Sequence, residues 1–201
     1  FPQHGWLSEE TVDSPERLSA SSVWIVDPID GTKEFLEGIP EFAVSIALVE
    51  DGEPTVAALY NPAADEMYTA IKGGGTFLNG QRVFCSELVD LSDASLIVSR
   101  SEKARGEVDA IEPFLGEVRP VGSVAYKLAV VAAGGADLNV SLQPKNEWDV
   151  CGRDLLVREA GGHMVDLDGE VRRYNQENPL IEGGLAAGNK HLTTAVLDVV
   201  R

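Results

Sequence analysis

The chain has 201 residues, of which 33 are acidic and 16 basic, and its net charge is −17. This charge disfavours binding to nucleic acid or to an anionic membrane surface, and we expect neither partner. A hydrophobic content of 44% argues against disorder, and no apolar run in the sequence is long enough to span a bilayer. A small phosphorylated ligand stays open if metal ions reverse the local charge.

The length predicts a single domain over residues 1–201 with a substantial core. Cys85 and Cys151 lack CxxC spacing, and no secretory leader opens the sequence. We therefore expect no disulfide framework and a cytoplasmic location.

The first half, about residues 1–92, has the pattern of a largely antiparallel sheet. The β-branched run VWIVD at 23–27 predicts a buried strand, and 42–62 predicts two strands around a turn at Asp51 and Gly52. Residues 66–83 continue this meander through the glycines at 73–75 and the Asn-Gly turn at 79–80.

The second half, about residues 93–201, alternates strands and helices and predicts a mixed α/β region. Strands are expected at 94–100, 117–122 and 137–142, and helices near 103–115, at 123–135 and at 147–162. A hairpin around Asp168 and Gly169 and a last helix from about residue 190 complete the pattern.

The segment VDPIDGTKEF at 26–35 places Asp27 and Asp30 on a turn constrained by Pro28. Two close carboxylates repel each other unless a positive charge lies between them, and Mg²⁺ prefers such oxygen ligands. An EF-hand is excluded because the alternating oxygen ligands and the closing glutamate are absent. The spacing alone also fits an Asx turn followed by a helix N-cap, which needs no metal.

Three predicted helices begin near Thr32, Ser123 and Asp149, and glycines precede the first two at Gly31 and Gly122. Free N–H groups at helix starts bind anions, so convergence of these ends would form a phosphate site. Each of the three residues is also an ordinary N-cap. Other chemistry lacks support, since no GxSxG, Walker A or GxGxxG motif occurs and the three histidines lack zinc spacing.

Together, VDPIDGT at 26–32, LSEE at 7–10 and EWDVCGRDLLVREAGG at 147–162 resemble the inositol monophosphatase superfamily, which consists of magnesium-dependent, lithium-sensitive phosphomonoesterases. The resemblance continues through GSVAYKLAVVAAGGAD and LAAGN and covers essentially the whole chain. It implies a layered αβαβα sandwich of the fructose-1,6-bisphosphatase type. Its amino-terminal helical layer, with an aspartate of the base relay, has no counterpart before Glu9, and we expect these residues to be missing from the sequence at hand.

The resemblance implies a site with two or three Mg²⁺ ions and a metal-activated water. Its ligands would be Glu9, Asp27 as the bridging carboxylate, the carbonyl of Ile29, Asp30 and Asp149. Catalysis would involve Glu9, Asp30 and the hydroxyl of Thr32, which would hold the attacking water. The substrate would contact Gly31, Thr32, Gly122, Ser123, Lys145 and Asp149, with Lys127 as a further candidate for a second phosphate.

The sequence DGTKEF is most like the 3′(2′),5′-bisphosphate nucleotidase branch and implies 3′-phosphoadenosine 5′-phosphate as substrate. Ser141 lies near the position where inositol phosphatases place a substrate-binding glutamate and nucleotidases an arginine, so an inositol, sugar or histidinol phosphatase is the alternative. A relative that binds metal or a phosphorylated ligand without catalysis is the alternative of another class. Similar proteins are often dimers, and a homodimer is possible here.

Overall fold

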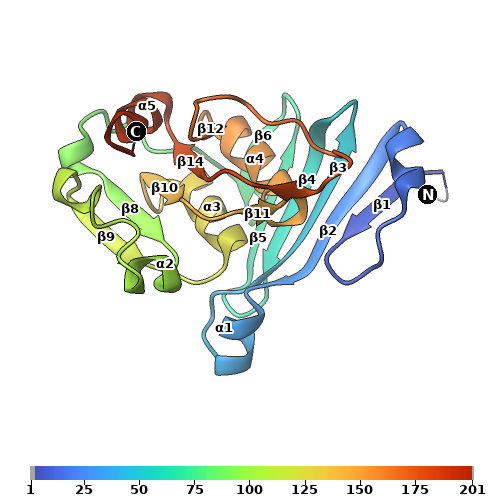
Figure 1. The fold of residues 1–201 in the computed structure, drawn as a ribbon, viewed down its shortest axis with the longest axis horizontal. Helices are drawn as coiled ribbons and strands as arrows, with labels where there is room; N and C mark the ends of the chain where they lie inside the picture. The colour runs from blue at the N-terminus through green and yellow to red at the C-terminus, as the bar shows by residue number, and fades with distance from the viewer. Residues whose placement is uncertain (1–2, 201) are drawn as a thin grey trace.

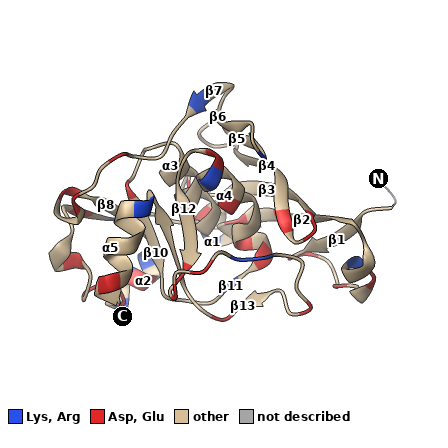
Figure 2. Cartoon of the chain, turned by 90° about the horizontal axis from the view of Figure 1, so that it is seen from above, with Lys and Arg blue, Asp and Glu red and all other residues tan. Residues whose placement is uncertain are grey.

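The computed structural model describes residues 3–200 and shows two large sheets with helices between them and beyond the smaller of the two (Figure 1). From one side to the other, the layers are a seven-stranded sheet, helices α3 and α4, a five-stranded sheet and helix α5. Acidic residues are spread over strands, helices and loops, whereas Lys and Arg are fewer (Figure 2).

The seven-stranded sheet follows the chain in order and, apart from its first pair, is an antiparallel meander. Strand β1 is parallel to β2, a pairing that the sequence pattern did not predict. The strands are β1 (Gly5–Ser8), β2 (Ser22–Asp30), β3 (Ala43–Glu50), β4 (Glu53–Asn61), β5 (Glu66–Ile71), β6 (Gly75–Leu78) and β7 (Gln81–Val83).

The five-stranded sheet has the order β12-β14-β10-β8-β9 and mixes parallel with antiparallel pairs. Its strands are β8 (Ser95–Val98), β9 (Glu117–Pro120), β10 (Leu138–Ser141), β12 (His163–Asp166) and β14 (Leu185–Gly188). A separate two-stranded ribbon pairs β11 (Lys145–Asn146) with β13 (Leu180–Ile181). Strand β11 directly precedes α4 in the chain.

The α-helices are α1 (Thr32–Glu37), α2 (Arg100–Ala104), α3 (Val124–Ala132), α4 (Glu147–Glu159) and α5 (Lys190–Val200). Short 3₁₀ turns are η1 (Pro15–Ser19), η2 (Leu91–Asp93) and η3 (Glu112–Phe114). Among the described helices, none combines the length and the apolar character needed to cross a membrane.

The main core lies between the seven-stranded sheet and helices α3 and α4. Alternate residues of β3, such as Ala43, Ala47 and Val49, are buried against this layer, as the two-residue period of a strand requires. The opposite face carries exposed apolar side chains, including Ile46 and Ile71. A second core lies between the five-stranded sheet and α5.

Three expectations from the sequence need correction. Of the predicted helix near 103–115, only residues 103 and 104 are α-helical, at the end of α2, because Gly106 takes a left-handed φ of 72° and the chain then turns toward η3. The turn at Asp168 and Gly169 is present, but the residues after it leave the sheet instead of forming a second hairpin strand. Helix α4 begins at Glu147, so Asp149 is its third residue and not its cap.

Cys85 and Cys151 are both buried free thiols. They lie in the main core, where they pack as small apolar side chains.

Candidate active site

A bulge in β2 places Asp27 and Asp30 on the same side of the sheet. In a regular strand, side chains three positions apart point to opposite faces. Here Asp27 pairs with Ser45 and Asp30 with Ala43, so three steps along β2 oppose two along β3. Pro28 lies inside the bulge, where its missing N–H costs no ladder hydrogen bond. The extra residue therefore turns both carboxylates toward one site.

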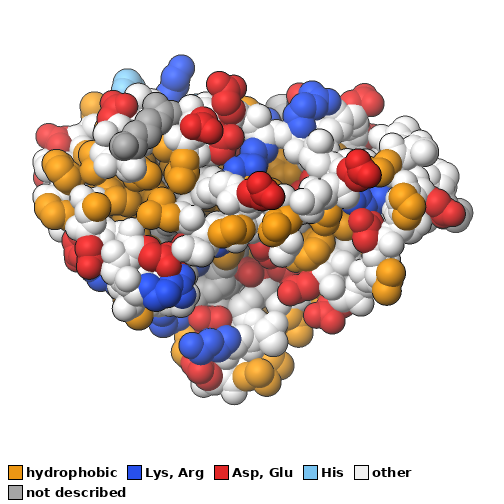
Figure 3. Space-filling model, viewed as in Figure 1, with side chains coloured by type: hydrophobic (Ala, Val, Ile, Leu, Met, Phe, Trp, Pro, Cys, Tyr) orange, Lys and Arg blue, Asp and Glu red, His pale blue; other side chains and the backbone are white. Residues whose placement is uncertain are grey.

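The start of α4 brings a third carboxylate to this place. One carboxylate oxygen each from Asp27, Asp30 and Asp149 lies within 4.8 Å of the others. Asp27 is fully buried, and 9% of Asp30 is exposed. The space-filling view shows acidic side chains in a hollow above α1 (Figure 3). The structure thus gathers three of the predicted metal ligands from two distant segments.

Each of these carboxylates is fixed through hydrogen bonds to one of its two oxygens. Asp27 Oδ1 accepts from the N–H of Ile29 at 3.1 Å, and Asp149 Oδ2 accepts from the N–H of Asn146 at 2.7 Å. Asp30 Oδ2 accepts from the hydroxyl of Ser123 and from the N–H of Ala125. The site is therefore largely formed before any ligand binds.

The other oxygen of Asp27 shows that the cluster fits a divalent cation. Asp27 Oδ2 is buried and has no hydrogen-bond partner, a costly state for an isolated carboxylate. A hard cation that prefers oxygen ligands supplies the missing partner and removes the repulsion among the three carboxylates. The donor set, all oxygen and negatively charged, suits Mg²⁺ rather than a thiophilic metal.

The electrostatics of the cluster lead to the same conclusion. Burial raises the pKa of Asp27 to about 8; the guanidinium of Arg153 opposes this rise, and the charge of Asp30 adds to it. Burial also raises the pKa of Asp149 to about 6, against the effect of its hydrogen bond from Asn146. A cation at the site favours the charged forms of both groups, so its binding must release protons.

Glu9, the predicted ligand from the LSEE motif, lies in the exposed turn after β1. Its pKa is raised by loss of water contacts and then by the charges of Glu10 and Asp30, and its carboxyl interacts with Asp27. The parallel pairing of β1 with β2 places the turn beside the cluster, which explains how residues 18 positions apart in the sequence interact. Glu9 is near Asp27 and Asp30 but is not in the group of three within 4.8 Å.

Thr32 and Ile29 are joined by a hydrogen bond at the end of β2. The Thr32 hydroxyl donates to the Ile29 carbonyl at 3.2 Å, which leaves the lone pairs of the hydroxyl oxygen free to accept another hydrogen bond. Thr32 is the first residue of α1, as predicted. Within α1 the first backbone bond runs from Phe35 N–H to Gly31 O, so the preceding N–H groups have no acceptor inside the helix.

Gly31 is required where β2 meets α1. Its φ of +88° is left-handed, and a Cβ there would lie 2.9 Å from the carbonyl oxygen of Glu41 and 3.1 Å from Cβ of Ser123. Ser123 itself caps α3, where its hydroxyl accepts from the N–H of Tyr126 at 3.0 Å. The N–H of the neighbouring Gly122 already donates to the carboxylate of Glu41, so a phosphate oxygen would have to replace that carboxylate.

A second polar cluster lies close to Asp30 and consists of Glu102, Lys127, Ser141 and Lys145. Glu102 accepts from the hydroxyl of Ser141 at 2.5 Å, and both are buried. Burial lowers the pKa of Lys127 to about 8, and Asp30, Glu102 and Lys145 are among its charged neighbours. Lys127 donates to the Ser123 carbonyl at 3.0 Å, and Lys145 donates to carbonyls of its own loop.

Arg153 is the site residue that sequence reasoning missed. It lies four residues after Asp149 on α4, is fully buried, and approaches both Asp27 and Asp30. The available signal was an arginine within the mostly apolar run Val150–Val157, four residues after Asp149, a spacing that puts the two side chains on one face of a helix.

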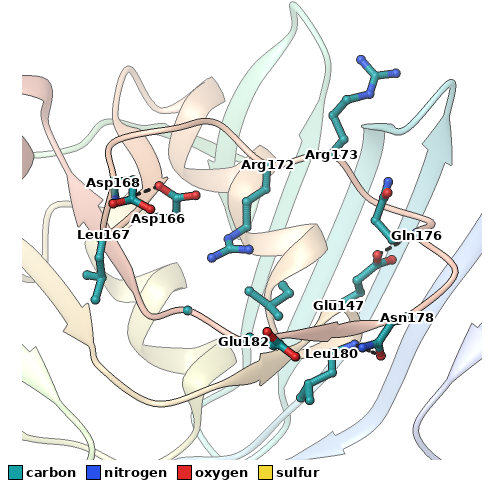
Figure 4. Close-up of a pocket in the computed structure, with 12 residues that line it drawn as sticks. Glu147, Asp166, Leu167, Asp168, Arg172, Arg173, Gln176, Asn178, Leu180 and Glu182 are labelled. Atoms are coloured by element: carbon teal, nitrogen blue, oxygen red, sulfur yellow. Dashed lines mark hydrogen bonds between the residues drawn. The ribbon is translucent and has the colours of Figure 1, made fainter.

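A cavity of about 420 Å³ elsewhere is lined by residues of the loop after β12 and by Glu147 (Figure 4). The Glu147 carboxylate accepts from the N–H groups of Asn175 and Gln176, and burial raises its pKa to about 7. The lining includes none of the three clustered aspartates. Glu147 therefore fastens this loop to α4 and has a structural role.

Known proteins match this sequence and this arrangement. The profile of the inositol monophosphatase family matches residues 1–201. The inositol-1-monophosphatase of Rhizobium meliloti is 38% identical over 207 residues, which cover 100% of this chain and 75% of the relative. The Nus factor SuhB of Escherichia coli K12 is 35% identical over 210 residues, with the same two shares.

A solved structure has the same fold. The Staphylococcus aureus inositol monophosphatase II with inositol monophosphate bound superposes with a TM-score of 0.85 at 26% identity, over 98% of this chain and 76% of that one. The sequence match is long and strong enough to decide the family. The chain therefore belongs to the inositol monophosphatase family and is a hydrolase of phosphoric monoesters.

Proposed function

We propose that this protein hydrolyses a small sugar-like monophosphate, with inositol 1-phosphate as the first candidate, at the cluster of Asp27, Asp30 and Asp149. The convergence of these carboxylates within 4.8 Å carries the proposal. The sequence pattern pointed first to 3′-phosphoadenosine 5′-phosphate. The relatives favour the alternative, because the Rhizobium meliloti and Mesorhizobium japonicum proteins are both named inositol-1-monophosphatases.

The cluster is proposed to hold two or three Mg²⁺ ions. Asp27 suits the bridging position because it is buried and its Oδ2 has no other partner. The remaining ligands would be Glu9, the Ile29 carbonyl, Asp30 and Asp149. When bound, the ions supply positive charge that lowers the pKa of water and stabilises the oxygens of the transferred phosphoryl group.

The residues around the cluster would orient the reactants. The Thr32 hydroxyl, which already donates to the Ile29 carbonyl, can accept a hydrogen bond from a water molecule and so orient the water oxygen toward phosphorus. Glu9 has a raised pKa and an exposed position, which suit a group that accepts the proton of this water. The free N–H groups at the start of α1 would bind phosphate oxygens. The water oxygen would form a new bond to phosphorus while the P–O bond opposite it breaks, and the leaving oxygen would take a proton from solvent and depart as the alcohol.

The neighbouring polar cluster fits a monophosphate better than a bisphosphate. Ser141 is buried and bound to Glu102, so nothing at that position extends toward an adenosine phosphate. Lys127 is only 2% exposed and donates to the Ser123 carbonyl. Lys145, which is partly exposed, is the lysine left to contact substrate. Lys145 is therefore the one lysine of this cluster that is available to bind a second phosphate.

Phosphate release with Mg²⁺ from four substrates tests the proposal: inositol 1-phosphate, 3′-phosphoadenosine 5′-phosphate, histidinol phosphate and fructose 1,6-bisphosphate. We expect the largest kcat/KM with inositol 1-phosphate and loss of turnover in Asp149→Asn. A preference for the nucleotide would refute the substrate proposal. Mg²⁺-dependent binding of all four without any phosphate release would instead support the non-catalytic alternative.

A further inference from the structure

Arg153 places a permanent positive charge behind the carboxylate cluster. Its Nη2 lies 3.9 Å from Asp27 Oδ2 and 4.0 Å from Asp30 Oδ2, and the side chain is fully buried. Nη1 donates to the Trp148 carbonyl, which anchors the guanidinium to the first turn of its own helix. The Nε and Nη2 atoms have no hydrogen-bond partner.

These contacts are unusual for a buried structural ion pair. Such pairs offset the cost of removing both charges from water through hydrogen bonds of about 2.7–2.9 Å. Arg153 instead remains about 1 Å farther from both carboxylates, at 3.9 and 4.0 Å. Its charge therefore acts on Asp27 and Asp30, while Asp27 Oδ2 is left available to another ligand.

Arg153 is not needed to neutralise the acidic residue beside it. Asp154 has its own partner, because Arg158 Nε lies 3.1 Å from Asp154 Oδ1 one turn farther along α4. The charged groups that face Arg153 belong to the carboxylate cluster: Asp27 and Asp30 on β2, and Asp149 on α4. Its charge is thus directed at the candidate metal centre.

We infer that Arg153 is a resident cation of this centre. It offsets part of the negative charge of Asp27 and Asp30 before a divalent ion enters, and so holds the carboxylates together in the metal-free protein. The same charge repels the entering ion and weakens Mg²⁺ binding. Arg153 is a positioning residue that acts through the carboxylates, and the inference rests on the proposed metal centre. Arginine suits the role because it stays charged when buried, whereas a buried lysine readily loses its proton.

The test compares Arg153→Met with wild type by titration of Mg²⁺ alone in a calorimeter and by unfolding in EDTA and in saturating Mg²⁺. Methionine keeps much of the volume and removes the charge. We expect about tenfold tighter Mg²⁺ binding, as the loss of a repulsive charge near the ion implies. The loss of stability should be much larger in EDTA than in Mg²⁺.

Two further variants separate charge from packing. Arg153→Gln removes the charge but keeps a polar side chain, and it should bind Mg²⁺ as tightly as Arg153→Met. Arg158→Met removes an arginine from the same helix that faces Asp154 rather than the cluster. It should destabilise the protein equally in EDTA and in Mg²⁺ and leave the Mg²⁺ affinity unchanged.

The outcomes separate this inference from the proposed function. Unchanged or weaker Mg²⁺ binding by Arg153→Met, beside a wild type that binds Mg²⁺, would overturn the inference alone. A wild type that binds no Mg²⁺ would overturn the metal centre as well. If Arg153→Met does not fold under either condition, Asp27→Asn/Arg153→Met decides: recovery of folding supports the charge coupling, and no recovery refutes it.

Discussion

The hydroxyl of Ser123 connects the two segments that build the site, and its removal gives a sharp prediction. The hydroxyl accepts from the Tyr126 N–H as the cap of α3 and donates to Asp30 Oδ2. Loss of a serine cap costs about 1 kcal/mol. Loss of a hydrogen bond to a carboxylate costs about 2 kcal/mol more. Ser123→Ala should therefore lower the free energy of unfolding by about 3 kcal/mol, or Tm by roughly 6–12 °C.

The matched control is Ser99→Ala. Ser99 caps α2, where its hydroxyl accepts from the Glu102 N–H at 3.0 Å, and it makes no contact with the three aspartates. It should cost about 1 kcal/mol, the value of a cap alone. Urea unfolding in EDTA gives both free energies, and Mg²⁺ titration should show weaker binding only for Ser123→Ala. If the two variants lose the same stability and bind Mg²⁺ equally, Ser123 does not position Asp30.

Three other predictions concern the turn after β2 and the titration of the cluster. Gly31→Ala should lose roughly 2 kcal/mol more stability than Gly38→Ala, measured by urea unfolding, because both φ values are positive but only the first Cβ meets other atoms. Thr32→Val should lower kcat roughly 100-fold without changing Mg²⁺ affinity, and Thr32→Ser should retain activity; equal losses in both would contradict a role for the hydroxyl. Because the pKa values of Asp27 and Asp149 in the folded protein are about 8 and 6, against 3.8 for an ordinary aspartate, the folded metal-free protein binds more protons than the unfolded chain. Its stability should thus fall as pH rises from 4 to 8 while Mg²⁺ affinity increases, and calorimetry in buffers of different ionisation enthalpy should detect proton release.

Much of the fold could be predicted because its signals are local. The meander from β3 to β7 follows from alternating apolar residues and from turns such as Asn79-Gly80, where both residues have a positive φ. Helix α5 begins at Lys190, as expected. The parallel pairing of β1 with β2 was missed because it depends on contacts between distant segments, which a four-residue strand does not signal.

The aspartates of the site could be named from motifs, but their joint geometry could not. The motif resemblance selected Asp27, Asp30 and Asp149, and the structure brings them together. That Asp27 and Asp30 share a side depends on the bulge at Pro28, which is defined by pairing with β3. Arg153 was missed because its role depends on burial next to β2, which the sequence does not show. The periodicity of α4 shows only that Arg153 lies on the same face as Asp149.

The most direct test of the proposed metal centre is to crystallise the protein with Mn²⁺ in place of Mg²⁺ and to locate the metal by anomalous scattering. We predict strong peaks among the carboxylates of Asp27, Asp30 and Asp149. Peaks only at other surface carboxylates, with these three side chains left without metal at saturating Mn²⁺, would contradict it.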